Sequence, residues 1–210
     1  MSKYKFYFRK SSFKKDLKNG EYLLKLISEL KPKNFLEIGV LEGVTSRNVC
    51  ELLNKINNGN FKFIGIDLFG EDVAVNNSEE FTPISYKIKN PLKWIYFRLI
   101  LKMEPNSKEC VEHLLRKFKN SVKIFKGYSK DILGKIDIKD IDLVFLDGGH
   151  RYETVREDLN LLLINLKKNS IILCDDYNVS HYGVKKAVDE IKDSHDFFDH
   201  KRFALLRVKK

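Results

Sequence analysis

The feature that most limits the fold of this 210-residue chain is a regular alternation between short apolar runs and segments with helical spacing. The apolar runs are rich in β-branched and aromatic residues, which is typical of buried strands. We expect strands at Asn34–Ile38, Phe61–Ile66, Val122–Phe125, Ile141–Leu146 and Ile171–Cys174. Apolar strands separated by amphipathic helices predict an α/β fold, in which a mostly parallel, doubly wound sheet is covered on both faces.

Between these strands, apolar residues recur at the three- and four-residue spacing of amphipathic helices. The helices are expected around residues 23–30, 49–56, 111–118, 155–166 and 184–191, and Ser107 is a candidate N-cap of the third. The last stretch, Phe197 to Val208, predicts two strands around the charged turn Asp199–Arg202. Strands so closely coupled are antiparallel, so the sheet gains a reversed strand near its end. The length predicts a single domain over residues 1–210.

Composition excludes several classes of protein. No apolar run approaches the roughly 20 residues that a transmembrane helix needs, and Met1 to Gly20 is basic, without the apolar core of a secretory signal. The three cysteines, Cys50, Cys110 and Cys174, are widely spaced and odd in number, and they form neither a zinc pattern nor a disulfide framework. We therefore expect a protein of the reducing cytoplasm.

The net charge of +10 has two interpretations. Basic residues are concentrated in residues 1–20 and 201–210, which is compatible with a nucleic-acid or anionic-membrane partner. A lysine-rich surface without such a partner is the alternative, and no RNA-binding motif is present. The sequence leaves open whether the protein forms a homo-oligomer.

One segment, residues 71–106, interrupts the alternation after the second strand. It contains Pro83 and Pro91, and Asn90–Met103 is aromatic and basic. We interpret the segment as a loop followed by an inserted helix. This insert is either a lid over a substrate pocket, which can also touch a membrane or a partner, or a helix packed against the sheet.

The first predicted strand leads into a glycine-rich turn. In a doubly wound sheet the ligand binds beyond the carboxyl ends of the strands. Gly39 and Gly43 allow a tight turn and a close approach of ligand to backbone, and Thr45 or Ser46 can cap the following helix. Asp67, after the second strand, is placed to accept hydrogen bonds from ribose hydroxyls. Together these features indicate an adenosine-type cofactor.

The spacing of the turn decides between cofactors. It is G-x-x-x-G preceded by the acid Glu37, whereas a dinucleotide site needs G-x-G-x-x-G to hold a pyrophosphate. Acidic side chains would repel a pyrophosphate but suit the ammonium and sulfonium groups of S-adenosylmethionine. A turn after the third strand, which ends at Ser129, can border the purine ring.

Three acids follow the fourth and fifth predicted strands. Asp147, Asp175 and Asp176 come from strand ends that should be neighbours, and unpaired carboxylates there would raise one another's pKa. A hard divalent cation resolves this repulsion, and an all-oxygen ligand set favours Mg²⁺ over zinc, with Mn²⁺ or Ca²⁺ as alternatives. His150, three residues beyond Asp147, is a candidate catalytic base.

These residues resemble those of class I S-adenosylmethionine-dependent methyltransferases, which have a Rossmann-like seven-stranded sheet. Glu37–Thr45 (E-x-G-x-x-x-G-x-T) resembles the family's first motif, and Asp67 its ribose-binding acid. The stretches Ile141–Leu159, IDLVFLDGGHRYETVREDL, and Ile171–Ile191 are similar to those of the metal-dependent macrocin O-methyltransferases, which act on sugars of macrolide antibiotics.

The resemblance implies a role for each matching residue. Glu37, Gly39, Gly43 and Thr45 would line the methionine part of the cofactor. The ribose would bind Asp67, the adenine would meet Ser129, and Asp147 would border the cofactor. The ligands of Mg²⁺ would be Asp147, Asp175 and Asp176. His150 stands where related catechol-type enzymes carry a lysine, which favours the sugar branch.

The predicted function is therefore Mg²⁺-dependent O-methylation of a small-molecule hydroxyl, most simply in the vicinal diol of a sugar or glycoside. His150 would remove the proton, and Asp147 would hold the metal beside it. Three alternatives stay open. The substrate can be a catechol or phenol, the enzyme can act on nucleic acid, or the fold can have become a binding module without turnover.

Overall fold

The computed structural model describes residues 19–69, 91–178 and 182–209. Within them the chain forms one seven-stranded sheet with the strand order β3-β2-β1-β4-β5-β7-β6. The strands are β1 (Asn34–Ile38), β2 (Lys62–Asp67), β3 (Val122–Lys126), β4 (Leu143–Leu146), β5 (Ile171–Cys174), β6 (Asp196–His200) and β7 (Phe203–Arg207). Strands β1 to β5 are parallel, and β7 is antiparallel to both β5 and β6. The predicted fold class is confirmed, including the C-terminal antiparallel strand.

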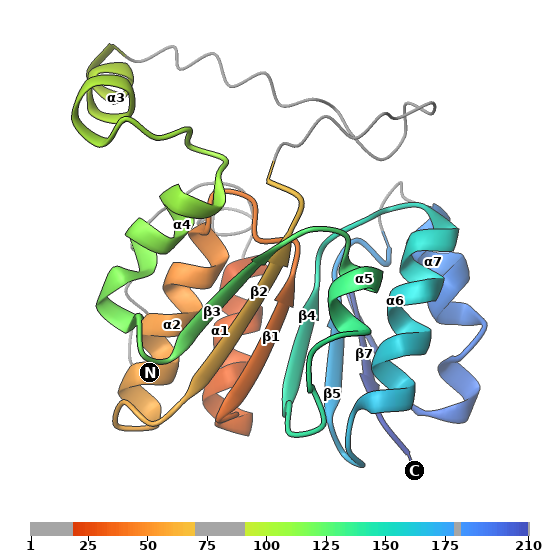
Figure 1. Cartoon of the computed structure of the whole chain (residues 1–210). Coiled ribbons are helices and arrows are strands. Elements are labelled where there is room, and N and C mark those ends of the chain that lie inside the picture. The colour runs from red at the N-terminus through yellow and green to blue at the C-terminus, as the bar shows by residue number, and fades with distance from the viewer. Residues whose placement is uncertain (1–18, 70–90, 179–181, 210) are drawn as a thin grey trace.

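Helices cover both faces of the sheet (Figure 1). One face is covered by α1 (Asn19–Leu30), α2 (Val44–Ile56) and α4 (Lys108–Leu115), and the other by α5 (Ser129–Leu133), α6 (Tyr152–Asn165) and α7 (Tyr182–Asp189). Successive residues of a strand point to opposite faces, so Phe35 packs into the first layer and Leu36 into the second. The core is therefore divided into two apolar clusters by the sheet. Short 3₁₀ turns, η3 (Arg116–Phe118) and η4 (Lys192–Ser194), follow α4 and α7.

Of the predicted helix N-caps, the one of α4 is confirmed and the one of α2 is not. Ser107 caps α4, where its hydroxyl accepts a hydrogen bond from the backbone N–H of Cys110 over 3.1 Å. Neither Thr45 nor Ser46 caps α2, so that expectation is wrong. The helix begins directly after Gly43, which has a left-handed backbone and no side chain to offer.

The described part of the insert is α3 (Pro91–Ile95) and a π-helical segment, η2 (Tyr96–Leu101). In Figure 1 this helix stands apart from the sheet, beyond α4. Five of its large apolar side chains are exposed, up to 67% for Ile100; the others are Trp94, Ile95, Tyr96 and Leu99, whereas Phe97 and Leu101 are partly buried. Packing against the sheet, one of the two alternatives for the insert, is therefore wrong for residues 91–101. The rest of the expected loop, and most of the basic N-terminal segment, lie outside the described residues.

Two further expectations from composition can be compared with the structure. Cys50, Cys110 and Cys174 are all free and buried, so no disulfide joins them. Among the helices of the described ranges, none combines the length and the apolar character that crossing a bilayer requires.

Candidate active site

The parallel strands end together at one edge of the sheet. Ile38 at the end of β1 lies beside Ile66 of β2 on one side and Leu146 of β4 on the other, and Leu146 lies beside Cys174 of β5. The chain passes from β1 to β2 and returns to the other side of β1 only at β4, so the β1–β4 boundary is the switch point where ligands bind in such sheets.

The turn after β1 is packed directly against the end of β4. Gly39 has a φ of 95°, and a Cβ atom there would lie 2.0 Å from the carbonyl oxygen of Asp147. The N–H of Gly39 donates to the carbonyl of Ile66 over 2.9 Å, and the N–H of Asp147 donates to that of Ile38 over 2.8 Å. The glycine-rich turn and the first acid of the predicted metal site therefore share one rigid piece of backbone.

Glu37 lies under this turn with no exposed surface. One carboxylate oxygen, Oε2, accepts a hydrogen bond from the Ser46 hydroxyl over 2.5 Å, whereas the other, Oε1, has no hydrogen-bond partner within the described part of the chain. Burial raises the pKa of Glu37 to about 8; the nearby charge of Asp67 adds to the shift, and the Ser46 hydrogen bond opposes it. An unpartnered buried carboxylate oxygen is suited to a cationic ligand group.

Asp67 fixes the same turn from the end of β2. Its carboxylate accepts hydrogen bonds from the backbone N–H of Leu41 over 2.8 Å and of Phe69 over 2.7 Å. The backbone carbonyl of Asp67 accepts from the N–H of Gly127 over 3.0 Å, which brings the turn before Ser129 beside it. Ser129 is the first residue of α5 and Thr45 lies in the first turn of α2, so these predicted cofactor residues border the same edge of the sheet.

The structure also groups two of the predicted metal ligands with the predicted base. Asp147, His150 and Asp176 each offer one ligand atom, and these atoms lie within 4.8 Å of one another. His150 Nε2 is 3.0 Å from Asp176 Oδ2. Burial raises the pKa of the Asp147 carboxyl well above its usual range, and the charges of Asp175 and Asp176 raise it further. The donor set and its negative charge fit a divalent cation.

Asp175 lies beside this group but faces a different partner. Arg202, in the turn between β6 and β7, binds its carboxylate with two nitrogens: Nη2 is 2.9 Å from Oδ2, and Nε contacts Oδ1. The same Nη2 contacts Oδ1 of Asp176. The three predicted metal ligands are thus neighbours, but in the described structure Asp175 is held by a guanidinium.

Arg202 is the site residue that the sequence did not identify. The charged turn Asp199–Arg202 was expected, but the sequence did not predict that the strand after this turn pairs with β5. Strand β7 pairs with β5 in antiparallel register, with Ala204 opposite Cys174. Continuing this register by two residues beyond the paired strands brings Arg202 beside Asp176. The register of the hairpin on β5 was the missing signal.

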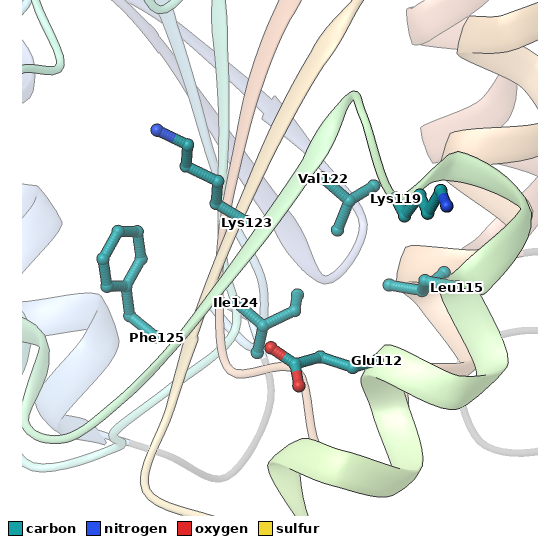
Figure 2. Close-up of a pocket in the computed structure, with 7 residues that line it drawn as sticks. All are labelled: Glu112, Leu115, Lys119, Val122, Lys123, Ile124 and Phe125. Carbon is teal, nitrogen blue, oxygen red and sulfur yellow. The ribbon is translucent and has the colours of Figure 1, made fainter.

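Two hollows differ in what lines them. A narrow pocket of about 10 Å³ lies among the acids and is bordered by Asp147, His150 and Asp175. A larger groove of about 340 Å³ lies at the edge strand β3, where Figure 2 shows side chains of α4 and β3 around it. None of the predicted site residues lines the larger groove, so the groove is not the candidate active site despite its larger volume.

Comparisons with known proteins agree with this geometry. The model of a methyltransferase domain family matches residues 36–177, from β1 through the Asp175–Asp176 pair. None of the curated protein sequences matches the chain.

Several solved structures share the fold. The O-methyltransferase NovP aligns over 92% of this chain and 81% of its own, with a TM-score of 0.63 and 18% identity. CalS11, described as a TDP-rhamnose 3′-O-methyltransferase of calicheamicin biosynthesis, aligns over 94% and 82%, with a TM-score of 0.62 and 15% identity. TomG from Streptomyces achromogenes, an O-methyltransferase of tomaymycin synthesis, was solved with S-adenosylmethionine and aligns over 91% and 79%, with a TM-score of 0.59 and 16% identity.

The seven-stranded order β3-β2-β1-β4-β5-β7-β6, with β7 antiparallel to its neighbours, is the class I methyltransferase fold. The match to the family model, which spans more than half of the chain, shows that the chain belongs to this methyltransferase family and is an S-adenosylmethionine-dependent methyltransferase.

Proposed function

We propose that the protein is a divalent-cation-dependent O-methyltransferase that methylates a hydroxyl of a sugar or glycoside, in a vicinal diol. The observation that carries the proposal is the grouping of Asp147, His150 and Asp176 directly beside the glycine-rich turn. Two carboxylates and an imidazole next to a methyl donor are suited to ionising a hydroxyl, which is poorly ionised at neutral pH.

The donor would lie in the turn after β1. Glu37, Gly39, Gly43 and Thr45 would surround its methionine part, with the unpartnered Oε1 of Glu37 available for the cationic end. Asp67 would hold the ribose and Ser129 would border the adenine, while Asp147 would separate the donor from the acceptor. This arrangement fixes the reacting methyl group in one orientation, which is a large part of the catalysis that positioning can supply.

The acid group would hold the cation, most simply Mg²⁺. Asp147 and Asp176 provide carboxylates within reach of one another, and Asp175, a predicted ligand, lies next to them with Arg202. When bound, the cation supplies a Lewis acid that lowers the pKa of a coordinated hydroxyl.

His150 would accept the proton of the acceptor hydroxyl. Its Nε2 lies 3.0 Å from Asp176 Oδ2, which can orient the ring towards the site. A positioned base of this kind contributes about 10²–10⁴-fold to the rate.

A sugar is favoured over a catechol by the CalS11 resemblance and by the histidine at position 150. The exposed aromatic side chains of α3 and η2 favour a phenolic acceptor if the insert forms a lid over it. A nucleic-acid acceptor depends on the basic ends of the chain, and it predicts binding to RNA or DNA that weakens steeply with salt.

Because the three cysteines are free, we expect the enzyme to act in the cytoplasm.

The direct test measures S-adenosylhomocysteine release with purified enzyme, S-adenosylmethionine and a panel of nucleotide sugars, glycosides and catechols. Turnover of a sugar that stops with EDTA and returns with Mg²⁺ is expected. The matched control is Asp131→Asn, an acid in the first turn of α5 outside the acid group, which should behave as wild type. Turnover that survives EDTA, together with an Asp147→Asn variant as active as wild type, would refute the metal-dependent mechanism.

A further inference from the structure

Arg202 is the one cation that the structure places on both Asp175 and Asp176 in the described part of the chain. It comes from a different part of the chain than the acids, and neither the family motifs nor the catalytic proposal gives it a role. We propose that Arg202 is the resident counter-ion of the Asp175–Asp176 pair, and that a divalent cation entering the site competes with its guanidinium for these carboxylates. The inference rests on the cation dependence proposed above.

The backbone holds Arg202 in place for this role. Its carbonyl accepts a hydrogen bond from the N–H of Tyr177 over 2.7 Å, and the side chain of Asn178 donates to the carbonyl of Lys201 over 2.7 Å. Tyr177 and Asn178 directly follow the acid pair. The turn between β6 and β7 is therefore fastened to the same short segment whose carboxylates its guanidinium neutralises.

The burial of the acids makes a counter-ion necessary. Asp175 is almost completely buried, and Asp176 is buried with a left-handed backbone at φ 59°. A buried carboxylate is costly unless it is paired. Arg202 meets this need with a bidentate contact to Asp175, a geometry that lysine cannot reproduce.

The positions of the Asp176 oxygens explain why the two cations would compete. Arg202 contacts Oδ1 of Asp176, whereas Oδ2 of the same carboxylate faces His150 in the candidate cation group. A cation bound there would lie close to the guanidinium, and like charges repel strongly in a site of low dielectric. Binding therefore has to overcome or displace Arg202.

The test measures cation affinity directly, without substrate or turnover. Mn²⁺ binding is followed by electron paramagnetic resonance and Mg²⁺ binding by calorimetry, for wild type, Arg202→Met and Arg202→Lys. The control is Arg207→Met, which removes an exposed arginine from the same hairpin. We expect Arg202→Met to bind both ions about ten-fold more tightly or better, because the competing charge is gone. Arg202→Lys keeps the charge but loses the bidentate contact, so its affinity should fall between those of wild type and Arg202→Met, whereas Arg207→Met should stay near the wild-type affinity.

A thermal unfolding series guards against loss of fold in Arg202→Met. In EDTA this variant should unfold at a lower temperature than wild type, and Mg²⁺ should stabilise it more than it stabilises wild type. If the variant does not fold, the wild type still provides the test. Its Arg202 Nε–H resonance, assigned by its loss in Arg202→Lys, should shift as Mg²⁺ is added.

The outcomes separate the two proposals. Wild type that binds cations while folded Arg202→Met binds no more tightly, or an Arg202 resonance that ignores bound Mg²⁺, overturns the role of Arg202 and leaves the proposed function intact. Absence of cation binding in every variant, with S-adenosylmethionine still bound, overturns the cation dependence itself.

Discussion

Gly39 and Asp147 lie so close together that a Cβ atom on the glycine would be 2.0 Å from the carbonyl oxygen of the aspartate. The contact joins the turn after β1 to the end of β4, and thereby the donor side of the site to the acid side. The φ of 95° at Gly39 is a second reason why this position requires glycine, because any residue with a side chain would be strained in that backbone conformation.

We expect Gly39→Ala to lower the free energy of unfolding by about 1–3 kcal/mol from backbone strain alone, and by more if the Asp147 backbone has to move. S-adenosylmethionine binding should weaken with it. Urea unfolding and calorimetry check both effects. Gly134→Ala is the control, because its backbone is right-handed and the nearest atom to an added Cβ is 3.5 Å away. Equal stability of the two variants would contradict the close contact.

The raised pKa of Glu37 predicts a pH dependence of stability. Its pKa rises from 4.5 to about 8 on folding, so between these values the folded chain holds a proton that the unfolded chain has released. The stabilisation is complete below pH 4.5 and is lost as the pH rises to about 8, at no more than about 1.4 kcal/mol per pH unit. Glu37→Gln should remove this contribution.

Urea unfolding of wild type and Glu37→Gln at several pH values between 4 and 9 gives the difference in their free energies of unfolding. Taking this difference cancels the contribution of the other acids, which titrate in both proteins. The difference should change between pH 4.5 and 8 and be constant outside that window. Ser46→Ala, which deletes the hydroxyl that donates to Glu37, should move the upper end of the window to higher pH. A difference that does not vary with pH would argue against a buried neutral Glu37.

Two acids of the same cluster should respond differently to neutralisation. Burial raises the pKa of Asp175 as it does that of Asp147, but the Asp175 carboxylate is paired with Arg202, so Asp175→Asn leaves the guanidinium without its bidentate partner and should cost up to about 3 kcal/mol of stability. Asp147→Asn removes a half-buried carboxyl whose pKa is raised by desolvation and by its acidic neighbours, so in EDTA it should stabilise the protein while cation binding is lost. Unfolding curves in EDTA give the signs, and two losses of similar size would contradict this distinction.

His150→Gln tests the proposed base. We expect kcat to fall by about 10²–10⁴-fold, while the affinity for S-adenosylmethionine stays unchanged because the donor turn is not altered. His113→Gln is the control, since that histidine lies on α4, away from the acid group. A His150 variant that keeps at least half of the wild-type kcat would exclude the role.

Much of the fold could be predicted because buried parallel strands are recorded locally as apolar runs. Asn34–Ile38 and Ile171–Cys174 match β1 and β5 at both ends. The hairpin at the C-terminus was also expected, from two strand-like runs around a charged turn. Asp67 and Asp147 were found because acids at strand ends are brought to one edge by the topology itself.

The remaining features depend on contacts that no local pattern records. The role of Ser46 follows from the buried carboxylate of Glu37 nine residues earlier, and the Arg202 contact follows from the register of β7 on β5. The short helix α5 and the π-helical turns of η2 were not expected, since both have few residues and no helical period of their own. Side-chain geometry across the sheet therefore had to come from the structure.

The strand order separates the coding sequence for β1–β3 from that for β4–β7, so the two parts could be exchanged by recombination between genes. The chain completes β1, β2 and β3 before it reaches β4, so the donor half of the enzyme is one uninterrupted stretch and the acid half is the next. Among the strands that the structure describes, the two halves are joined in the sheet by the pairing of β1 with β4. Recombination with a relative between Leu133 and Leu143 would keep Glu37, Asp67 and Ser129 on one parental segment and replace the acid group as a unit.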